Sequence, residues 1–464
     1  MDYKEKNVNR TVDVLENLFE DRFYQVDFDN AAVDKAVAKT HHNTEGFHFE
    51  ISKMILSSEQ DVKNLLDRDS EIIQFNDFQN TLSFKIKDCH DVTISVSTNG
   101  ATVVNGYINA LKIEKRNNNI QKYFRAVILT KKKVVLSHLF NDVKKLKVDG
   151  TTYGSGVLEF EVNNLSVDLF SYYSEKTNKN YFVIETNEVY EYEQFTSIID
   201  EIILAICYLD GTFLGNSVYF LGSNTQDFRD NIMLGINRFF DELDDGFPVV
   251  PDYYFLRELV GDTKKFQTSS ILKSLTENLI SDIVFKRTIL LLCQAHSEPH
   301  YVQASLYSVA LETISNIIST LIEDKNKPIQ DNTLAKSLRE DLKSSLEKYK
   351  TRITEEAFKK INGDIERLNS LTNKQKLLLP FSYYNCNLTA NEILAIENRN
   401  DFLHGRIPEN ADRHHLPTIV ARLLFCVNTL VMKHIGYEGY VYHQPSMYQY
   451  NNKLTIERDL LVSI

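Results

Sequence analysis

The chain has 464 residues, of which 43% are hydrophobic and 25% are charged, and its formal net charge is -12. This composition is ordinary for a globular protein, the length suits about two to three domains, and the negative charge excludes a protein that coats nucleic acid with its whole surface. The sequence shows no membrane-spanning run, no signal-peptide pattern and no metal-ligand or redox spacing among its five cysteines. It therefore predicts a soluble cytoplasmic protein without a cofactor or a metal.

Residues 1–225 show the alternation of apolar and polar side chains that is typical of strands, with turn signals between the runs. Two stretches have helical spacing instead. Predicted strands cover Thr81–Asp88, Asp91–Thr98, Tyr123–Thr130, Gly156–Val162, Asn180–Thr186 and Asn216–Gly222, and predicted helices cover Thr11–Phe19 and Phe195–Gly211. Many short strands at close spacing favour an antiparallel sandwich or a barrel-like sheet, which we interpret as a regulatory domain.

Residues 226–436 have an apolar period near 3.6, which predicts a bundle of helices. The predicted helices are Phe228–Leu243, Tyr253–Val260, Ser269–Ala295, Val302–Ile322, Thr333–Tyr349, Thr354–Asn369, Ala390–Leu403 and Pro417–Ile435. The run LLLPFSYYNCN reads as a loop, and residues 437–464 form a tail rich in tyrosine and asparagine. The predicted fold class is therefore α+β, with an antiparallel β-rich domain followed by an all-α domain.

The stretch ENRNDFLHG, residues 397–405, holds the main candidate site. Thr389 begins a capping-box pattern, and Gly405 stands where a helix commonly ends, so His404 falls in the last turn. Arg399 and His404 are five residues apart and point about 140° away from each other on a regular helix. A single chain is therefore poorly arranged to hold one phosphate with both groups, whereas two copies related by a two-fold axis can line one cleft. The alternative is a solvated helix end with a histidine that complements the helix dipole.

The segment from Asn369 to Gly436 resembles the end of a HEPN domain. That family carries an arginine and a histidine four to six residues apart, usually with Asn, Asp or His directly after the arginine. The apolar stretches Arg422–Tyr437 and Tyr301–Ile318 resemble helices of such domains. The layout of a strand-rich half followed by a HEPN bundle is similar to the ApeA-like abortive-infection proteins of bacteria.

This resemblance implies a homodimeric, metal-independent endoribonuclease in anti-phage defence, with RNA, most readily transfer RNA, as substrate. The expected catalytic residues are Arg399, Asn400 and His404. Glu312, an acid within a predicted apolar helix, is either a surface residue or a partner of Arg399. A phage-derived trigger is expected to relieve the restraint that the first domain imposes. The alternatives are a catalytically silent HEPN binding module and the toxin half of a toxin–antitoxin pair.

A basic run between Lys112 and Lys147 includes Lys131, Lys132 and Lys133. These lysines are candidate contacts for RNA or for an acidic trigger. The alternative is a hairpin whose lysines protect an edge strand. Elsewhere, His296 and His300 lie four residues apart, but Pro299 breaks the helical spacing and no carboxylate or cysteine completes a metal site.

Overall fold

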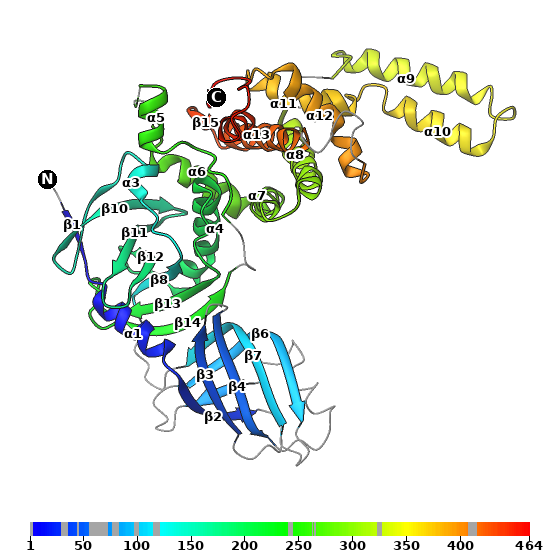
Figure 1. Cartoon of the computed structure of the whole chain (residues 1–464). Coiled ribbons are helices and arrows are strands. Elements are labelled where there is room, and N and C mark those ends of the chain that lie inside the picture. Colours follow the sequence, from blue (N-terminus) through cyan, green and yellow to red (C-terminus); the bar gives the residue numbers. More distant parts are fainter. Residues whose placement is uncertain are drawn as a thin grey trace. The chain divides into compact units, whose positions relative to one another are not determined.

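The computed structural model describes residues 3–28, 36–43, 46–54, 73–76, 83–96, 102–114, 121–239, 245–261, 263, 266–322, 327–406 and 415–464. The chain forms two compact units, Met1–Ser281 and Asp282–Ile464. The first is rich in strands and the second is helical (Figure 1), which confirms the α+β two-domain class. The tail of residues 437–464 lies within the second unit.

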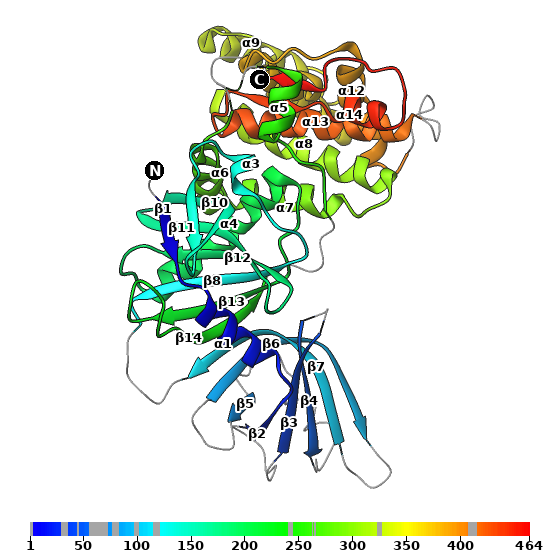
Figure 2. The same ribbon diagram turned by 60° about the vertical axis from the view of Figure 1, so that its left-hand side comes forward.

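The first unit contains a closed ring of six antiparallel strands (Figure 2). Its strands are β2 (Arg22–Phe28), β3 (Ala36–Asn43), β4 (Gly46–Met54), β5 (Ile73–Asn76), β6 (Ser83–Val96) and β7 (Thr102–Glu114). The ring closes because β7 pairs with β4 on one side and with β6 on the other. Phe49, Phe75 and other apolar side chains fill its interior, so it is a packed barrel.

The remaining strands form a second sheet in the order β1-β9-β10-β11-β12-β8-β13-β14. They are β1 (Tyr3–Lys6), β8 (Tyr123–Thr130), β9 (Lys144–Val148), β10 (Thr151–Val162), β11 (Leu165–Ser174), β12 (Lys179–Thr186), β13 (Ser217–Ser223) and β14 (Ile232–Arg238). Strand β14 joins the sheet to the barrel by pairing with β7 at Leu111 and its neighbours. All of these pairings are antiparallel except β1 with β9. The first unit thus combines a closed barrel, one of the two predicted alternatives, with an open sheet.

Helices cover this second sheet. They are α1 (Asn9–Phe19), α3 (Leu136–Leu139), α4 (Tyr192–Asp210), α5 (Tyr253–Leu259) and α6 (Ser269–Ser281). Phe195 of α4 stacks on Phe124 of β8, while the next residue, Arg125, points to the opposite face of the strand. Gly211 ends α4 in the left-handed conformation with φ 69°, as its C-cap position predicts.

The predicted helix Phe228–Leu243 is wrong, because its central residues form strand β14. Pairing with β13 and β7 outweighs the local helical pattern, and Gly235 allows the carbonyl of Leu111 to approach within 2.7 Å of where a Cβ would stand. Because β14, α5 and α6 all belong to the first unit, that unit extends to Ser281, whereas the sequence placed its end at residue 225.

The second unit is a bundle built around two long helices, α8 (His300–Ile322) and α13 (Leu416–His434). The other elements are α7 (Ile283–Ala295), α9 (Asn332–Glu347), α10 (Glu355–Glu366), α11 (Asn373–Tyr383), α12 (Ala390–Leu403), β15 (Tyr440–Tyr442), α14 (Gln444–Asn451) and β16 (Leu461–Ser463). Helices α9 and α10 pair with each other as a hairpin. The Asn369 side chain closes its base by exchanging hydrogen bonds of 2.7 and 3.0 Å with the backbone of Ile329.

Two further predictions in this region are wrong. The predicted helix Ser269–Ala295 is two helices, because the Asp282 side chain accepts hydrogen bonds from the backbone of Val284 and Phe285 and starts α7. The predicted loop LLLPFSYYNCN contributes most of α11, which begins with a capping box formed by Thr372 and Gln375.

Among the described residues, α8 and α13 are long and apolar enough to cross a membrane. Most of α13 is buried inside the bundle, as is typical of a core helix in a soluble protein.

Candidate active site

The helix that carries the ENRNDFLHG stretch is fixed at both ends. At its start, the Thr389 hydroxyl accepts from the backbone N–H of Glu392 at 3.3 Å, and the Glu392 carboxylate accepts from the backbone N–H of Thr389 at 2.6 Å. At its end His404 is the C-cap residue, and Gly405 takes the left-handed conformation with φ 69°. The predicted bounds of α12, Ala390–Leu403, are confirmed.

Arg399 points from α12 toward α8 and is only 4% exposed. Its Nε donates to Oε1 of Glu312 at 3.0 Å, and its Nη1 lies 3.4 Å from the carbonyl oxygen of Ile396. The Glu312 side chain is 38% exposed, so the carboxylate of this ion pair is in contact with solvent while the guanidinium is almost buried. Of the two interpretations of Glu312, the structure therefore has it as the partner of Arg399.

Asn400 and His404 are exposed. The chain thus buries Arg399 between two helices and presents the other two residues to solvent. This arrangement follows from the helical spacing, since residues five apart cannot share one face. Within one chain, the Arg399 guanidinium and the His404 imidazole are therefore not placed to hold one phosphate together.

A polar network ties the C-terminal tail to the start of the same helix. Glu392, which is fully buried, accepts a hydrogen bond from His443 Nε2 at 3.0 Å and from Arg458 Nη1 at 3.3 Å. Burial alone would raise the pKa of the Glu392 carboxyl, but the hydrogen bonds from His443 and Thr389 and the charge of Arg458 lower it overall. The sequence analysis missed this network, and the capping-box position of Glu392 was the available signal.

The network also contains a serine, a histidine and a carboxylate in a row, which is the arrangement of the catalytic triad in serine hydrolases. The Ser446 hydroxyl lies 2.7 Å from His443 Nδ1, and His443 in turn contacts Glu392. All three side chains are fully buried, however, and the same hydroxyl lies 2.7 Å from the carbonyl oxygen of Arg458. A substrate cannot reach this serine, so the network fastens the tail to the bundle.

The two histidines near the start of α8 each lie within hydrogen-bond distance of a side chain of that helix. His300 Nδ1 lies 3.1 Å from the Gln303 side-chain oxygen, and His296 Nδ1 lies 3.2 Å from the Tyr307 hydroxyl. Burial lowers the pKa of His296 to about 4. Within the described parts of the chain, no group of three His, Cys, Asp or Glu side chains is placed to hold a metal ion.

The three lysines after β8 have different surroundings. Lys131 lines a cavity in the first unit. Lys132 forms an ion pair of 2.5 Å with Asp245, and Lys133 is exposed to solvent. Of the three lysines, Lys131 is the one that contributes to this cavity.

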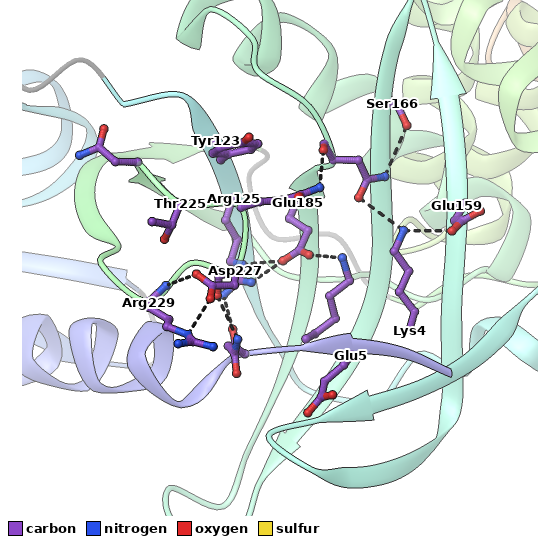
Figure 3. Close-up of a pocket in the computed structure, with 15 residues that line it drawn as sticks. Lys4, Glu5, Tyr123, Arg125, Glu159, Ser166, Glu185, Thr225, Asp227 and Arg229 are labelled. Carbon is purple, nitrogen blue, oxygen red and sulfur yellow. Dashed lines mark hydrogen bonds and ion pairs between the residues drawn. The ribbon is translucent and has the colours of Figure 1, made fainter. Parts of the chain in front are cut away.

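A second and larger cavity of the first unit, of about 970 Å³, is lined by many charged side chains (Figure 3). Glu159, Asp168, Glu185 and Arg125 lie in register across four neighbouring strands. Three acids side by side repel one another, and two lysines of β1 neutralise them. Lys4 pairs with Glu159 and Asp168, and Lys6 pairs with Asp168 and Glu185.

These buried charges satisfy one another. Burial opposes ionisation of Glu185, but Arg125 and Lys6 more than offset it and lower its pKa. Arg125 also lies over the Phe228 ring, 4.1 Å from its centre. Because each buried cation already has an acidic partner, we interpret this cluster as the fastening of β1 to the sheet.

The sequence matches no model of a known protein family, and no curated protein is significantly similar to it.

Proposed function

We propose that the chain is a metal-independent endoribonuclease of the HEPN type that acts in bacterial abortive infection. In this proposal the helical unit cuts RNA in the cytoplasm as a homodimer, with transfer RNA as the expected substrate. The strand-rich unit restrains it until a phage-derived trigger is present. Arg399, Asn400 and His404 are the proposed catalytic residues.

The chemistry is attack of a ribose 2′-hydroxyl on the adjacent phosphate, which leaves a 2′,3′-cyclic phosphate and a 5′-hydroxyl end. A base must take the 2′ proton and an acid must supply one to the leaving oxygen, and the His404 imidazole is the proposed group for these proton transfers. A planar guanidinium suits the two oxygens of the phosphorane, and this is the role of Arg399. Asn400 holds the phosphate or orients the imidazole. Because DNA lacks the 2′-hydroxyl, it is not a substrate.

The observation that supports this proposal most is the ion pair between Arg399 and Glu312. An arginine held between two helices by a carboxylate is oriented, and it lies five residues before an exposed histidine at the helix end. A solvated helix end needs no such buried partner. Glu312 is the proposed positioning residue, since it fixes the guanidinium without touching the substrate.

The same ion pair also favours the second candidate, a catalytically silent HEPN binding module. With Arg399 almost buried, the guanidinium in this state is committed to Glu312 and not to a phosphate. For a nuclease, this state is the resting one, and binding of RNA or a second chain must expose the guanidinium. The third candidate, the toxin half of a toxin–antitoxin pair, predicts co-purification with a partner or a modified residue beside the motif.

The test is cleavage of end-labelled transfer RNA in EDTA by the full chain, the His404→Ala variant and the matched control His300→Ala. His300 is an exposed histidine of the same unit outside the motif. We expect the wild type and His300→Ala to yield fragments with cyclic-phosphate ends, and His404→Ala to yield none while remaining folded. The loss should exceed about a hundredfold, since acid–base catalysis typically contributes 10² to 10⁴ in rate.

Cleavage by His404→Ala at the wild-type rate would refute the assignment of that residue. If the wild type is inactive, the reaction is repeated with lysate from phage-infected cells, which supplies a trigger. Inactivity there as well, together with measurable RNA binding, would favour the silent module.

A further inference from the structure

The cavity that Lys131 lines has a volume of about 560 Å³ and lies within the first unit. Its walls come from segments far apart in the sequence: the facing ends of β3 and β4, the end of β8, the turn before β12 and the loop that precedes β13. This volume is in the range of cavities that bind small organic molecules.

The lining is rich in hydrogen-bond donors and contains no aspartate or glutamate among the described residues. Three asparagines contribute to it, and they are Asn178, Asn180 and Asn216. Two lysines contribute as well. Lys179 is paired with Glu16 at 2.9 Å, whereas Lys131 is exposed and forms no ion pair within the described chain. The charge of Lys131 also acts on the nearby Asp245 carboxylate, but Asp245 is itself paired with Lys132. In a protein of charge -12, a cavity without a lining carboxylate and with a lysine that no lining acid pairs with favours an anion.

The lining also contains side chains that suit a flat or apolar group. Phe213 and Leu129 line it, and His42 and Tyr219 form a hydrogen-bonded pair with 2.9 Å between Nε2 and the hydroxyl oxygen. Burial is the main reason that the pKa of His42 is lowered to about 4, so this imidazole is neutral at pH 7. Among the described residues that line the cavity, Lys131 is therefore the cation without an ion-pair partner.

Three residues that line the cavity have a backbone in the left-handed half of conformational space. Gly46, Gly215 and Asn178 all have positive φ, of 134°, 144° and 54°. A Cβ on Gly215 would stand 2.6 Å from the carbonyl oxygen of Leu129, so glycine is required there. Such conformations tend to gather where the chain shapes a ligand site.

The larger cavity in Figure 3 differs in the charge that it offers to a ligand. There, each buried cation is neutralised by an acid of the chain itself.

We propose that the smaller cavity binds a phosphate-bearing small molecule of mononucleotide size, with Lys131 on the phosphate and Phe213 against the base. This site goes beyond the proposed nuclease, and its binding can be measured whether or not the chain cuts RNA.

The test is isothermal titration calorimetry on the full-length protein with adenosine 5′-monophosphate, adenosine and inorganic phosphate. We expect saturable binding of the nucleotide and at least about tenfold weaker binding of adenosine, since a hydrogen bond to a charged group contributes that much. Lys131→Gln should weaken nucleotide binding by a similar factor. Lys133→Gln removes the same charge two residues away, outside the cavity, and should bind as the wild type does.

A fourth protein, His404→Ala, separates this cavity from the motif on α12, and it should also bind normally. The proposal is overturned if no probe binds below about 10 mM, a limit weaker than that of a specific site. It is equally overturned if adenosine binds as well as the nucleotide, or if Lys131→Gln leaves nucleotide binding unchanged.

Discussion

Arg399 carries a permanent charge into a nearly buried position, because a guanidinium stays protonated at any physiological pH. Burying such a charge is costly unless a partner of opposite charge and hydrogen bonds accompany it. The carboxylate of Glu312 supplies that partner at 3.0 Å. The pair therefore links the stability of the bundle to the residue proposed for phosphate binding.

Replacing Glu312 by Gln should destabilise the helical unit by about 1–3 kcal/mol, because the guanidinium keeps a hydrogen-bond acceptor but loses its counter-charge. Urea unfolding followed by far-UV circular dichroism measures this loss. The matched control is Glu356→Gln, at an exposed position in the first turn of α10, which should change stability by less than about 0.5 kcal/mol. Equal stability of the two variants would show that the pair contributes nothing to the fold.

Because His296 is largely buried, we expect the helical unit to lose stability in mild acid. Burial lowers the pKa of His296 to about 4. Between pH 6.5 and 4 its imidazole is therefore protonated in the unfolded chain and neutral in the folded chain. The stabilisation is complete above pH 6.5 and is lost as the pH falls toward 4, by up to about 3 kcal/mol. His296→Gln cannot titrate and should flatten this part of the stability curve for the helical unit. The exposed His300→Gln should keep the wild-type slope, and equal slopes for all three proteins would contradict the prediction.

At the scale of elements, α12 depends on its first turn. Thr389→Ala removes the hydroxyl that caps Glu392 N–H and should cost about 1 kcal/mol, whereas Thr389→Ser should retain most of it. Urea midpoints of the two variants give the comparison. Since Thr389 is at the opposite end of the helix from His404, the cap variant should cut RNA at a near-normal rate at 25 °C. A large loss of cleavage with intact stability would place Thr389 in the site.

Elements with strong local signals were predictable from the sequence. The cap at Thr389 and the glycine at 405 predicted the bounds of α12, and a short run rich in apolar and aromatic residues predicted β8. Strand β14 was not predictable in this way, because only its pairing with β7 and β13 makes it a strand. Helical spacing predicted that Arg399 and His404 point apart, but it did not predict which of them is buried. Glu312 was predicted to be either a surface residue or the partner of Arg399, and the two are paired. The cavity beside Lys131 has no local signal, and the tail network has only the capping-box position of Glu392, since each joins segments distant in the chain.

At the scale of the whole molecule, the proposed site requires two chains, because a single chain buries Arg399 and exposes His404, on different sides of the helix. Mixing the Arg399→Ala and His404→Ala variants under conditions that exchange subunits tests this requirement. If each site takes its arginine from one chain and its histidine from the other, mixed dimers regain one intact site, and the mixture should show about a quarter of wild-type cleavage. Each variant alone should be inactive. A mixture as inactive as its components would show that each site lies within one chain.

The contacts of the β1 lysines affect the order in which the nascent chain can fold. Tyr3–Lys6 pairs with Lys145–Val148, and its lysines reach acids as far along as Glu185. On a ribosome that adds about 5–20 residues per second, this first strand waits roughly ten to thirty seconds before its last partner has been synthesised. During that time the row of acids and the lysines that neutralise it are not yet together. Contacts between residues so distant in the chain also slow folding. We therefore expect docking of the first strand to be a late step, and chaperones that bind exposed strand edges to act on this segment of the nascent chain.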